Sequence, residues 1–396
     1  MKSVTKLLAA LLFAGASATA PAQSPNVLKI GALLPLTGPG GVTGLSTIAG
    51  LQAAIKEVND TGGILGRQIV LVQADDAGDP TQGVNEARRL AQSEKVGFVI
   101  GSISSTITLA VMPIFTEAKV LQFSSTGASD ATPQKGPYHF STISTGGEAQ
   151  ALNYINYALN IAKVKKIAIL SDSSPLYRDL TDIMQKMAPA RGLTITSAEL
   201  FDPRVPDLLP HLLRARRGNP DMLWQLGLYP VDTVTTMKGL KELKWDVPLS
   251  LGLGGGSQAS TLPTIVPADQ LLPYTAQTFT AVTYCSNTAL GDAPLPKLLN
   301  KLRPAIPNLD KMVPTSVASG YDTIYILKQV YTATGNFDTP TAATWIENNV
   351  DKINSVVFKF AKSPGNAHFL VGESSMAMAE NPHIKRADGL VKRAGC

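Results

Sequence analysis

The segment Gly101-Ser102-Ile103-Ser104-Ser105-Thr106 gathers hydroxyl groups at the expected start of a helix in this 396-residue sequence. Hydroxyl groups and free backbone N–H groups in such a position can hold an anion, for example a carboxylate. Ser104 or Ser105 can equally serve only as the N-cap of that helix. The pattern favours neither interpretation, so both remain open.

The motifs of catalytic and nucleotide-binding sites are absent or incomplete in this sequence. The sequence contains neither HExxH nor GxxxxGK[ST]. The segment 252–257, GLGGGS, lacks the last glycine of the nucleotide-binding GxGxxG motif, and 255–259 lacks the second glycine of a nucleophile elbow. Asp75, Asp76 and Asp172 follow expected strands, where carboxylates more often complete turns than perform acid–base catalysis.

Metal and redox chemistry also find little support. The chain has no CxxC motif, and its two cysteines, Cys285 and Cys396, could form a disulfide or remain free thiols. Its histidines are far apart in sequence, at positions 139, 211, 368 and 383. The residue patterns therefore identify no catalytic site, no cofactor site and no metal site.

Short apolar runs alternate with helical patterns, which predicts βαβ units and parallel sheets. The first series is expected to have strands at 27–34, 68–74, 96–100 and 120–123, and helices at 45–59, around 84–91 and at 104–119. The second is expected to have strands at 166–170, 193–198, 222–225 and 248–253, and helices at 177–188, 208–217 and 231–244. Two such series predict two α/β lobes, each with its own core.

The loops after the expected strands form the candidate ligand site, because open parallel sheets bind ligands beyond the carboxyl ends of their strands. These loops are rich in Gly, Ser and Thr and poor in charge. They cover residues 37–43, 101–106, 124–129, 171–177, 227–230 and 252–257.

The first 22 residues have the pattern of a secretory signal peptide. Lys2 and Lys6 accompany an apolar run at 7–14, and Ala20-Pro21-Ala22 matches a signal-peptidase site. A membrane anchor is the alternative, but the run is too short for a bilayer core of roughly 30 Å. We expect cleavage after Ala22 and a mature chain in the periplasm.

The length of the chain predicts about two or three domains. No stretch of about 18 apolar residues follows the signal peptide, which indicates a soluble exported protein. Hydrophobic residues make up 44% of the chain and charged residues 16%, which suits sizeable cores and argues against disorder. Without Lys2 and Lys6, the formal net charge falls from +5 to about +3, which is too small to indicate nucleic-acid binding. The densest basic stretch, at Arg214, Arg216 and Arg217, is interpreted as a solvated helix end.

The segment 28–39, LKIGALLPLTGP, closely resembles the opening of periplasmic substrate-binding proteins of the branched-chain amino-acid type, which serve ABC importers. The resemblance extends over essentially the whole mature chain and is looser after about residue 203. Further matching positions are Gly50, Ala53-Ala54, Val58-Asn59, 62–67, Asp75-Asp76, Asp79-Pro80, 99–101, Ser104-Ser105, 167–170, Tyr177 and Gly320-Tyr321-Asp322.

This resemblance implies the type I fold, in which two doubly wound α/β lobes with parallel-rich sheets are joined by three hinge crossovers. Lobe 1 would comprise 27–142 and 278–351, and lobe 2 would comprise 143–277 and 352–396. In the first lobe, the implied ligand-binding residues are Thr43, Ser104, Ser105, Thr126, Ala128 and Ser129. In the second lobe, they are Tyr177, Leu228, Tyr229, Leu253 and Gly254.

The departures from the family pattern bear on the ligand. Amino-acid binders of this family hold the ligand ammonium with acidic groups, but 250–255 contains no acid and 144–148 contains only Glu148, slightly displaced. A buried ammonium without a counter-charge costs on the order of several kcal/mol. We therefore expect a carboxylate with an apolar or aromatic body rather than a plain α-amino acid.

Two further departures concern the first lobe. The family's hydroxyl at Ala128 is lost, so that Thr126 or Ser129 would substitute for it. The family's disulfide near the first turn is absent, because Gly78 and Ser104 occupy the matching positions.

The expected function is binding by hinge closure, as a monomer that docks transiently on an ABC permease at the inner membrane. A ligand-sensing receptor component of the same fold is one alternative. A secreted α/β hydrolase is the other, and it would turn its ligand over instead of releasing it intact.

Overall fold

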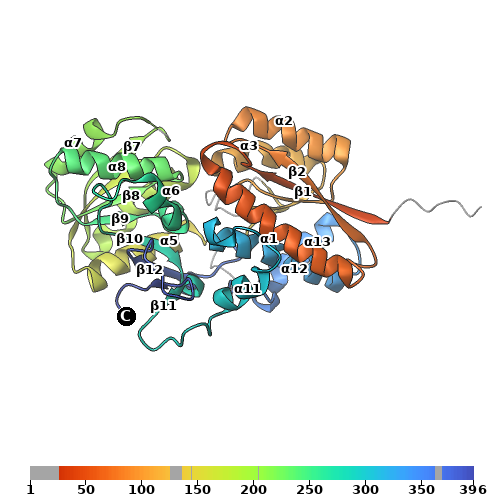
Figure 1. Ribbon diagram of the computed structural model, residues 1–396. Coiled ribbons are helices and arrows are strands. Elements are labelled where there is room, and N and C mark those ends of the chain that lie inside the picture. Colours follow the sequence, from red (N-terminus) through yellow and green to blue (C-terminus); the bar gives the residue numbers. More distant parts are fainter. Residues whose placement is uncertain (1–25, 125–135, 144, 204, 362–367) are drawn as a thin grey trace, which may run out of the picture.

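The computed structural model describes residues 26–124, 136–143, 145–203, 205–361 and 368–396. Two α/β units lie side by side, one built around each of two larger sheets (Figure 1). The predicted α/β class with parallel-rich sheets is confirmed.

The first sheet is parallel throughout, with strand order β2-β1-β3-β4-β5. Its strands are β1 (Val27–Leu34), β2 (Gln68–Asp75), β3 (Phe98–Ile100), β4 (Leu121–Ser124) and β5 (His139–Ser141). The central strands are buried on both faces, which explains why they form continuous apolar runs in the sequence.

Helices cover both faces of the first sheet (Figure 1). On one face lie α1 (Gly41–Asp60), α12 (Pro314–Thr334) and α13 (Thr339–Asn349), with α11 (Pro294–Leu302) packed against α12. On the other face lie α2 (Pro80–Arg88), its π-helical continuation η2 (Arg89–Glu94) and α3 (Ser105–Glu117).

The second sheet has the strand order β12-β10-β9-β8-β6-β7, and only the β10–β12 pair is antiparallel. Its strands are β6 (Lys166–Asp172), β7 (Thr194–Phe201), β8 (Met222–Leu226), β9 (Leu249–Leu251), β10 (Tyr274–Phe279) and β12 (Met376–Glu380). Its helices are α5 (Gly147–Asn156), α6 (Pro175–Met187), α7 (Leu209–Arg217), α8 (Pro230–Glu242), α9 (Leu253–Ser257) and α10 (Leu262–Ile265), with the π-helical turn η3 (Tyr157–Ile161) after α5.

Single helical turns occupy several connections between these elements. They are η1 (Gly38–Gly40), η4 (Pro189–Arg191), η5 (Ala259–Thr261), η6 (Thr280–Val282), η7 (Leu309–Lys311), η8 (Val350–Lys352) and η9 (Glu373–Ser375). The chain passes between the two units after β5, after β10 and before β12. Among the described helices, none is both long and apolar enough to cross a membrane.

The predicted strands and helices of both series are present, with differences at their ends. The strand expected at 248–253 is wrong at its end: β9 stops at Leu251, and Gly252 is the N-cap of α9. The loop expected at 37–43 includes η1 and the first turn of α1. The basic stretch is confirmed as an exposed helix end, because Arg214, Arg216 and Arg217 lie in the last turn of α7.

The three carboxylates after strand ends complete turns, as expected. Asp75 accepts hydrogen bonds from the backbone N of Leu36 (2.8 Å) and from Thr37 Oγ1 (2.7 Å). Asp76 accepts from Ser102 Oγ (2.6 Å) and Gly78 N (2.9 Å). Asp172 accepts from the backbone N of Ser174 and of Leu228, both at 2.9 Å, so it ties the start of α6 to the loop after β8.

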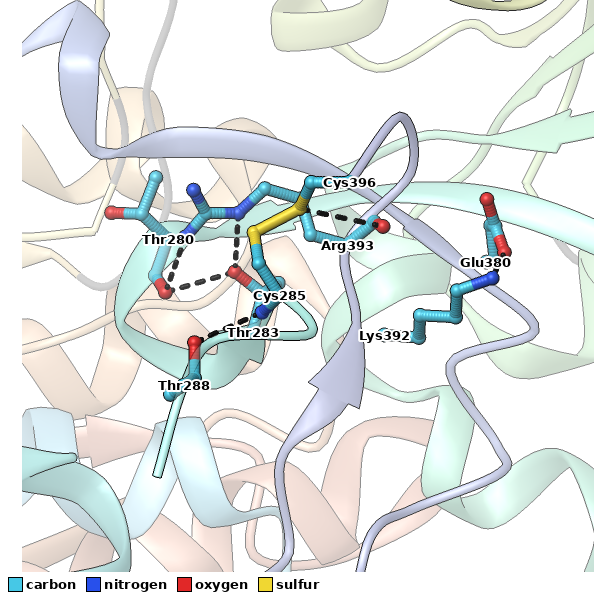
Figure 2. Close-up of a disulfide and its surroundings, with 8 residues drawn as sticks. All are labelled: Thr280, Thr283, Cys285, Thr288, Glu380, Lys392, Arg393 and Cys396. Atoms are coloured by element: carbon cyan, nitrogen blue, oxygen red, sulfur yellow. Dashed lines mark hydrogen bonds and ion pairs between the residues drawn. A yellow bond between two sulfur atoms is a disulfide. The ribbon is translucent and has the colours of Figure 1, made fainter. Parts of the chain in front are cut away.

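Cys285 and Cys396 form a disulfide, which settles the alternative left open by the sequence (Figure 2). The bond joins the C-terminus to the segment that follows β11 (Thr283–Tyr284), where β11 pairs in parallel with β13 (Val391–Lys392). Arg393 strengthens this junction by donating from Nε to Thr283 Oγ1 (2.9 Å). The disulfide therefore fastens the last residues of the chain to the connection that leaves the second sheet.

Asp322 in α12 holds the connection that precedes β12. Its carboxylate is buried and accepts hydrogen bonds from the backbone N of Val356 (2.6 Å) and Val357 (3.1 Å). Burial raises the pKa of Asp322 from the ordinary 3.8 to about 6, and these hydrogen bonds offset only part of that effect. The folded protein therefore binds a proton here at a pH where the unfolded chain has released it.

We expect a pH dependence of stability from Asp322, because a raised carboxyl pKa stabilises the fold below the unfolded value and loses this effect as pH rises through about 6. Between about pH 4 and pH 7, the free energy of unfolding should fall by about 2 kcal/mol relative to that of Asp322→Asn. Urea unfolding of both proteins across this range measures the difference. If the free energies of unfolding of the two proteins changed with pH in parallel, Asp322 would not have the raised pKa assigned to it.

Candidate ligand-binding site

A cavity of about 50 Å³ lies between the two units. The residues around it follow the carboxyl ends of strands in both sheets or begin helices that face the junction, which is the position expected for a ligand of parallel sheets. Its lining comprises Thr43, Ile103, Ile143, Leu176, Tyr177, Leu228, Leu253, Gly254, Ser257, Gln258, Thr315 and Ser316. Within the part of the chain that the structure describes, this lining contains no charged side chain and no histidine.

Five of the predicted site residues line this cavity, namely Thr43, Tyr177, Leu228, Leu253 and Gly254. Tyr229 does not line it: this residue is buried as the N-cap of α8. Ser104 and Ser105 are buried at the start of α3, beside the lining residue Ile103. The predicted residues Thr126, Ala128 and Ser129 lie outside the described residues.

The segment with Ser104 and Ser105 contacts the unit built around the second sheet directly. Ser105 Oγ accepts a hydrogen bond from the backbone N of Leu176 at 3.3 Å, although the two residues are 71 positions apart. Ser104 occupies the N-cap position of α3, but its side chain makes no capping hydrogen bond. The N-termini of α3 and α6 therefore meet at the cleft, which goes beyond the capping role considered for Ser105.

Tyr177 supports the second-unit side of the cavity. Its hydroxyl oxygen accepts a hydrogen bond from Gly254 N at 2.9 Å, and both residues line the cavity. Burial raises the pKa of Tyr177, and the nearby carboxylates of Asp172 and Asp232 raise it further, so the phenol stays neutral. A Cβ at Gly254 would lie 2.4 Å from the carbonyl oxygen of Gly227, so this position has no room for a side chain.

We expect Tyr177→Phe to lower the free energy of unfolding by about 1–2 kcal/mol, because the buried N–H of Gly254 would lose its acceptor while the ring stays in place. Tyr331→Phe is the matched control, since the buried Tyr331 hydroxyl has no hydrogen-bond partner among the described residues. Chemical denaturation measures the change in the free energy of unfolding for both variants. Equal effects of the two substitutions would show that the Tyr177–Gly254 hydrogen bond contributes nothing.

Sequence reasoning missed seven lining residues: Ile103, Ile143, Leu176, Ser257, Gln258, Thr315 and Ser316. Ile103, Leu176 and Ser257 belong to strand-end loops that the sequence did single out. Gln258 Nε2 donates to the carbonyl oxygen of Leu228 (2.6 Å), and Ser257 Oγ donates to that of Gly254 (2.9 Å). These two side chains thus stabilise the backbone segments that face the cavity.

The acidic group that would pair with an ammonium does not reach this cavity. Glu148, the single acid in the stretch 144–148, is exposed in the first turn of α5 and is not among the lining residues. The buried Asp172 is engaged by Ser174 and Leu228 and does not line the cavity either. No group of three or more His, Cys, Asp or Glu side chains that could hold a metal ion occurs in the described ranges.

Relatives in sequence agree with this architecture. The family model described as "Periplasmic binding protein" matches residues 27–381. The Leu/Ile/Val-binding protein BraC3 of Rhizobium johnstonii is 30% identical over 230 residues, which are 58% of this chain and 61% of that protein. The match to this curated relative therefore spans about three fifths of its length.

Solved structures share the fold across nearly the whole chain. A leucine-binding protein LivK from Thermotoga maritima has a TM-score of 0.75 and 19% identity, covering 93% of this chain and 98% of that one. A solute-binding protein of an ABC transporter from Rhodopseudomonas palustris, solved in complex with p-hydroxybenzoic acid, has a TM-score of 0.75 and 21% identity, covering 93% and 95%. The chain thus belongs to the periplasmic binding protein family, has its type I fold, and is related to the branched-chain amino-acid type.

Proposed function

We propose that this protein is the solute-binding component of an ABC importer and that it binds a small organic acid between its two lobes. The observation that carries the proposal is the cavity between the units, which lies at strand ends of both sheets and is lined by neutral side chains. Binding would not involve catalysis, so the ligand would leave unchanged. The proposed lobes are 27–142 with 278–351, and 143–277 with 352–396.

The preferred ligand is a carboxylate with an apolar or aromatic body. Five aliphatic side chains line the cavity: Ile103, Ile143, Leu176, Leu228 and Leu253. The N-terminus of α3, with Ser104 and Ser105, would hold the carboxylate through hydroxyl and backbone N–H groups. A free α-amino acid fits less well, because its ammonium would be buried without a counter-charge among the described lining residues. The likeness to a protein that was solved with p-hydroxybenzoic acid is compatible with this ligand class.

Hinge closure would couple binding to transport. The hydrogen bond between Leu176 N and Ser105 Oγ joins the two units and would help to hold them together, and a ligand that contacts both lobes would favour closure. The closed protein, as a monomer, would then dock transiently on a permease at the inner membrane. We propose the periplasm as its location, after removal of residues 1–22, which lie outside the described residues.

The test uses the purified mature chain and a thermal-shift screen followed by calorimetry. The screen compares leucine, isoleucine and valine with benzoate, 4-hydroxybenzoate, phenylacetate and hexanoate. We expect the acids without an ammonium group to give the larger rise in Tm, and chromatography to recover the bound acid intact. The largest shift with a branched-chain amino acid would overturn the ligand class, and turnover of the ligand would overturn the binding role.

A further inference from the structure

The N-terminus of α12 also reaches the cavity. Thr315 and Ser316, in the first turn of this 21-residue helix, both line the cavity. Since α12 covers one face of the first sheet and α3 covers the other, the two helix starts approach the cavity from opposite faces of that sheet. A ligand lying between them would therefore present two different ends to two helix N-termini.

Thr315 carries a buried hydroxyl that lacks a partner. The residue is only 7% exposed, and its Oγ1 makes no hydrogen bond within the described part of the chain. Further into α1 and α6, the hydroxyls of Thr47 and Thr181 donate to the carbonyl four residues earlier, Thr43 O (3.0 Å) and Tyr177 O (2.7 Å). The hydroxyls of Ser319 and Thr323 in α12 are, like that of Thr315, buried and unpartnered among the described residues, but neither residue lines the cavity. An unpaired buried hydroxyl is costly, so its place beside a cavity calls for an explanation.

The surroundings of Thr315 favour an electronegative partner. Thr315 also lines a second, smaller cavity of about 40 Å³, which shares Ser257 with the first. Lys385 lines this second cavity and is its one charged residue among the described residues; the described lining of the first cavity has none. The partial positive charge of the α12 N-terminus acts in the same direction as the Lys385 ammonium. Both features favour an oxygen acceptor and disfavour an ammonium group.

We propose that the ligand carries a second oxygen function, a hydroxyl, carbonyl or carboxylate group, at the end remote from α3, and that Thr315 Oγ1 at the start of α12 binds it. This inference rests on the proposed function, since it assumes that a carboxylate occupies the α3 end. It narrows the substrate class to acids with an apolar middle and oxygen at both ends. Thr315 would then determine specificity by rejecting acids that lack the distal oxygen, because these would leave its hydroxyl unpaired.

The test compares pairs of acids that differ only at the distal end, where one member carries an oxygen function. A hydroxyl distinguishes 4-hydroxybenzoate from benzoate and 4-hydroxyphenylacetate from phenylacetate, and a second carboxylate distinguishes adipate from hexanoate. Calorimetry on the full mature chain gives the dissociation constant of each. In the pair that binds most tightly, we expect at least a tenfold preference for the oxygenated acid. In Thr315→Val, which keeps the shape and removes the hydroxyl, the oxygenated acid should bind at least tenfold more weakly and the preference should disappear.

Thr323→Val is the matched control, because Thr323 lies two turns further along α12, is also buried and unpartnered among the described residues, and lines neither cavity. Both valine variants should fold at least as stably as the parent without ligand, but only Thr315→Val should change the ligand preference. Equal binding of both members of every pair, unaffected by Thr315→Val, would overturn the inference and leave the proposed function standing. If none of the six acids bound, the ligand class itself would be wrong, and this inference would fail with it.

Discussion

Replacing Cys285 with serine is expected to lower the free energy of unfolding by about 4 kcal/mol, because the disulfide closes a loop whose ends are 111 positions apart. A cross-link over such a long loop restricts the unfolded chain strongly, while it costs the folded chain little. The loss of stability should first affect the C-terminal end of the chain. There, β11 and β13 pair over only two residues each, and Arg393 adds a hydrogen bond to Thr283.

Urea denaturation of Cys285→Ser, Cys396→Ser and the double variant measures the effect of this disulfide. The double variant should unfold at the same urea concentration as either single variant, since all three lack the same bond. The parent protein treated with a reductant should show a similar loss of stability. A single variant that unfolds at the same urea concentration as the untreated parent would contradict the prediction.

The first half of the fold was predictable because its strands are buried by helices on both faces. Such strands appear in the sequence as short apolar runs, and the strand expected at 27–34 coincides with β1 (Val27–Leu34). The start of α2 can also be explained from its sequence, although this helix was expected only around 84–91. Asp79 caps α2 by accepting from Gln82 N (2.8 Å), and Pro80 follows as the first helical residue.

The later elements escaped prediction for physical reasons. Helix α12 is buried along almost all of its circumference from Thr315 to Leu327, so it shows no apolar stripe of helical period. Strand β10 buries the polar residues Gln277 and Thr278, and its antiparallel partner β12 lies about a hundred positions away in the chain. Neither a polar buried strand nor a distant pairing leaves a local pattern in a single sequence.

The candidate site was likewise predictable only in part. The strand-end rule directed attention to the loops that hold Tyr177 and Leu228, and the family resemblance selected these residues within them. Thr315 was missed because its approach to the cavity depends on where α12 packs, and no motif marks that packing. The two interpretations of Ser105 also required the structure, since its hydrogen bond to Leu176 joins segments from different lobes.

Replacing Gly50 with alanine should destabilise the protein by at least about 3 kcal/mol, because α1 and α12 cross in direct backbone contact. A Cβ at Gly50 would lie 2.0 Å from the carbonyl oxygen of Val317, and one at Gly320 would lie 2.2 Å from that of Thr47. Both obstacles are backbone atoms, so no side-chain rotation can relieve the clash. Either alanine would force the helices apart, and this cost exceeds the roughly 1 kcal/mol that alanine gains over glycine in helix propensity.

Gly97→Ala is the matched control, because its Cβ would meet only the end of the Leu28 side chain, at an ordinary 3.7 Å. We expect this variant to be as stable as the parent or slightly more so, since alanine restricts the unfolded chain more than glycine does. Urea unfolding separates the cases, and equal midpoints for Gly50→Ala and Gly97→Ala would contradict the packing argument. Gly50→Ala should also weaken ligand binding, since α1 carries Thr43 and α12 carries Thr315 to the same cavity, and any separation of these helices would move the two residues apart.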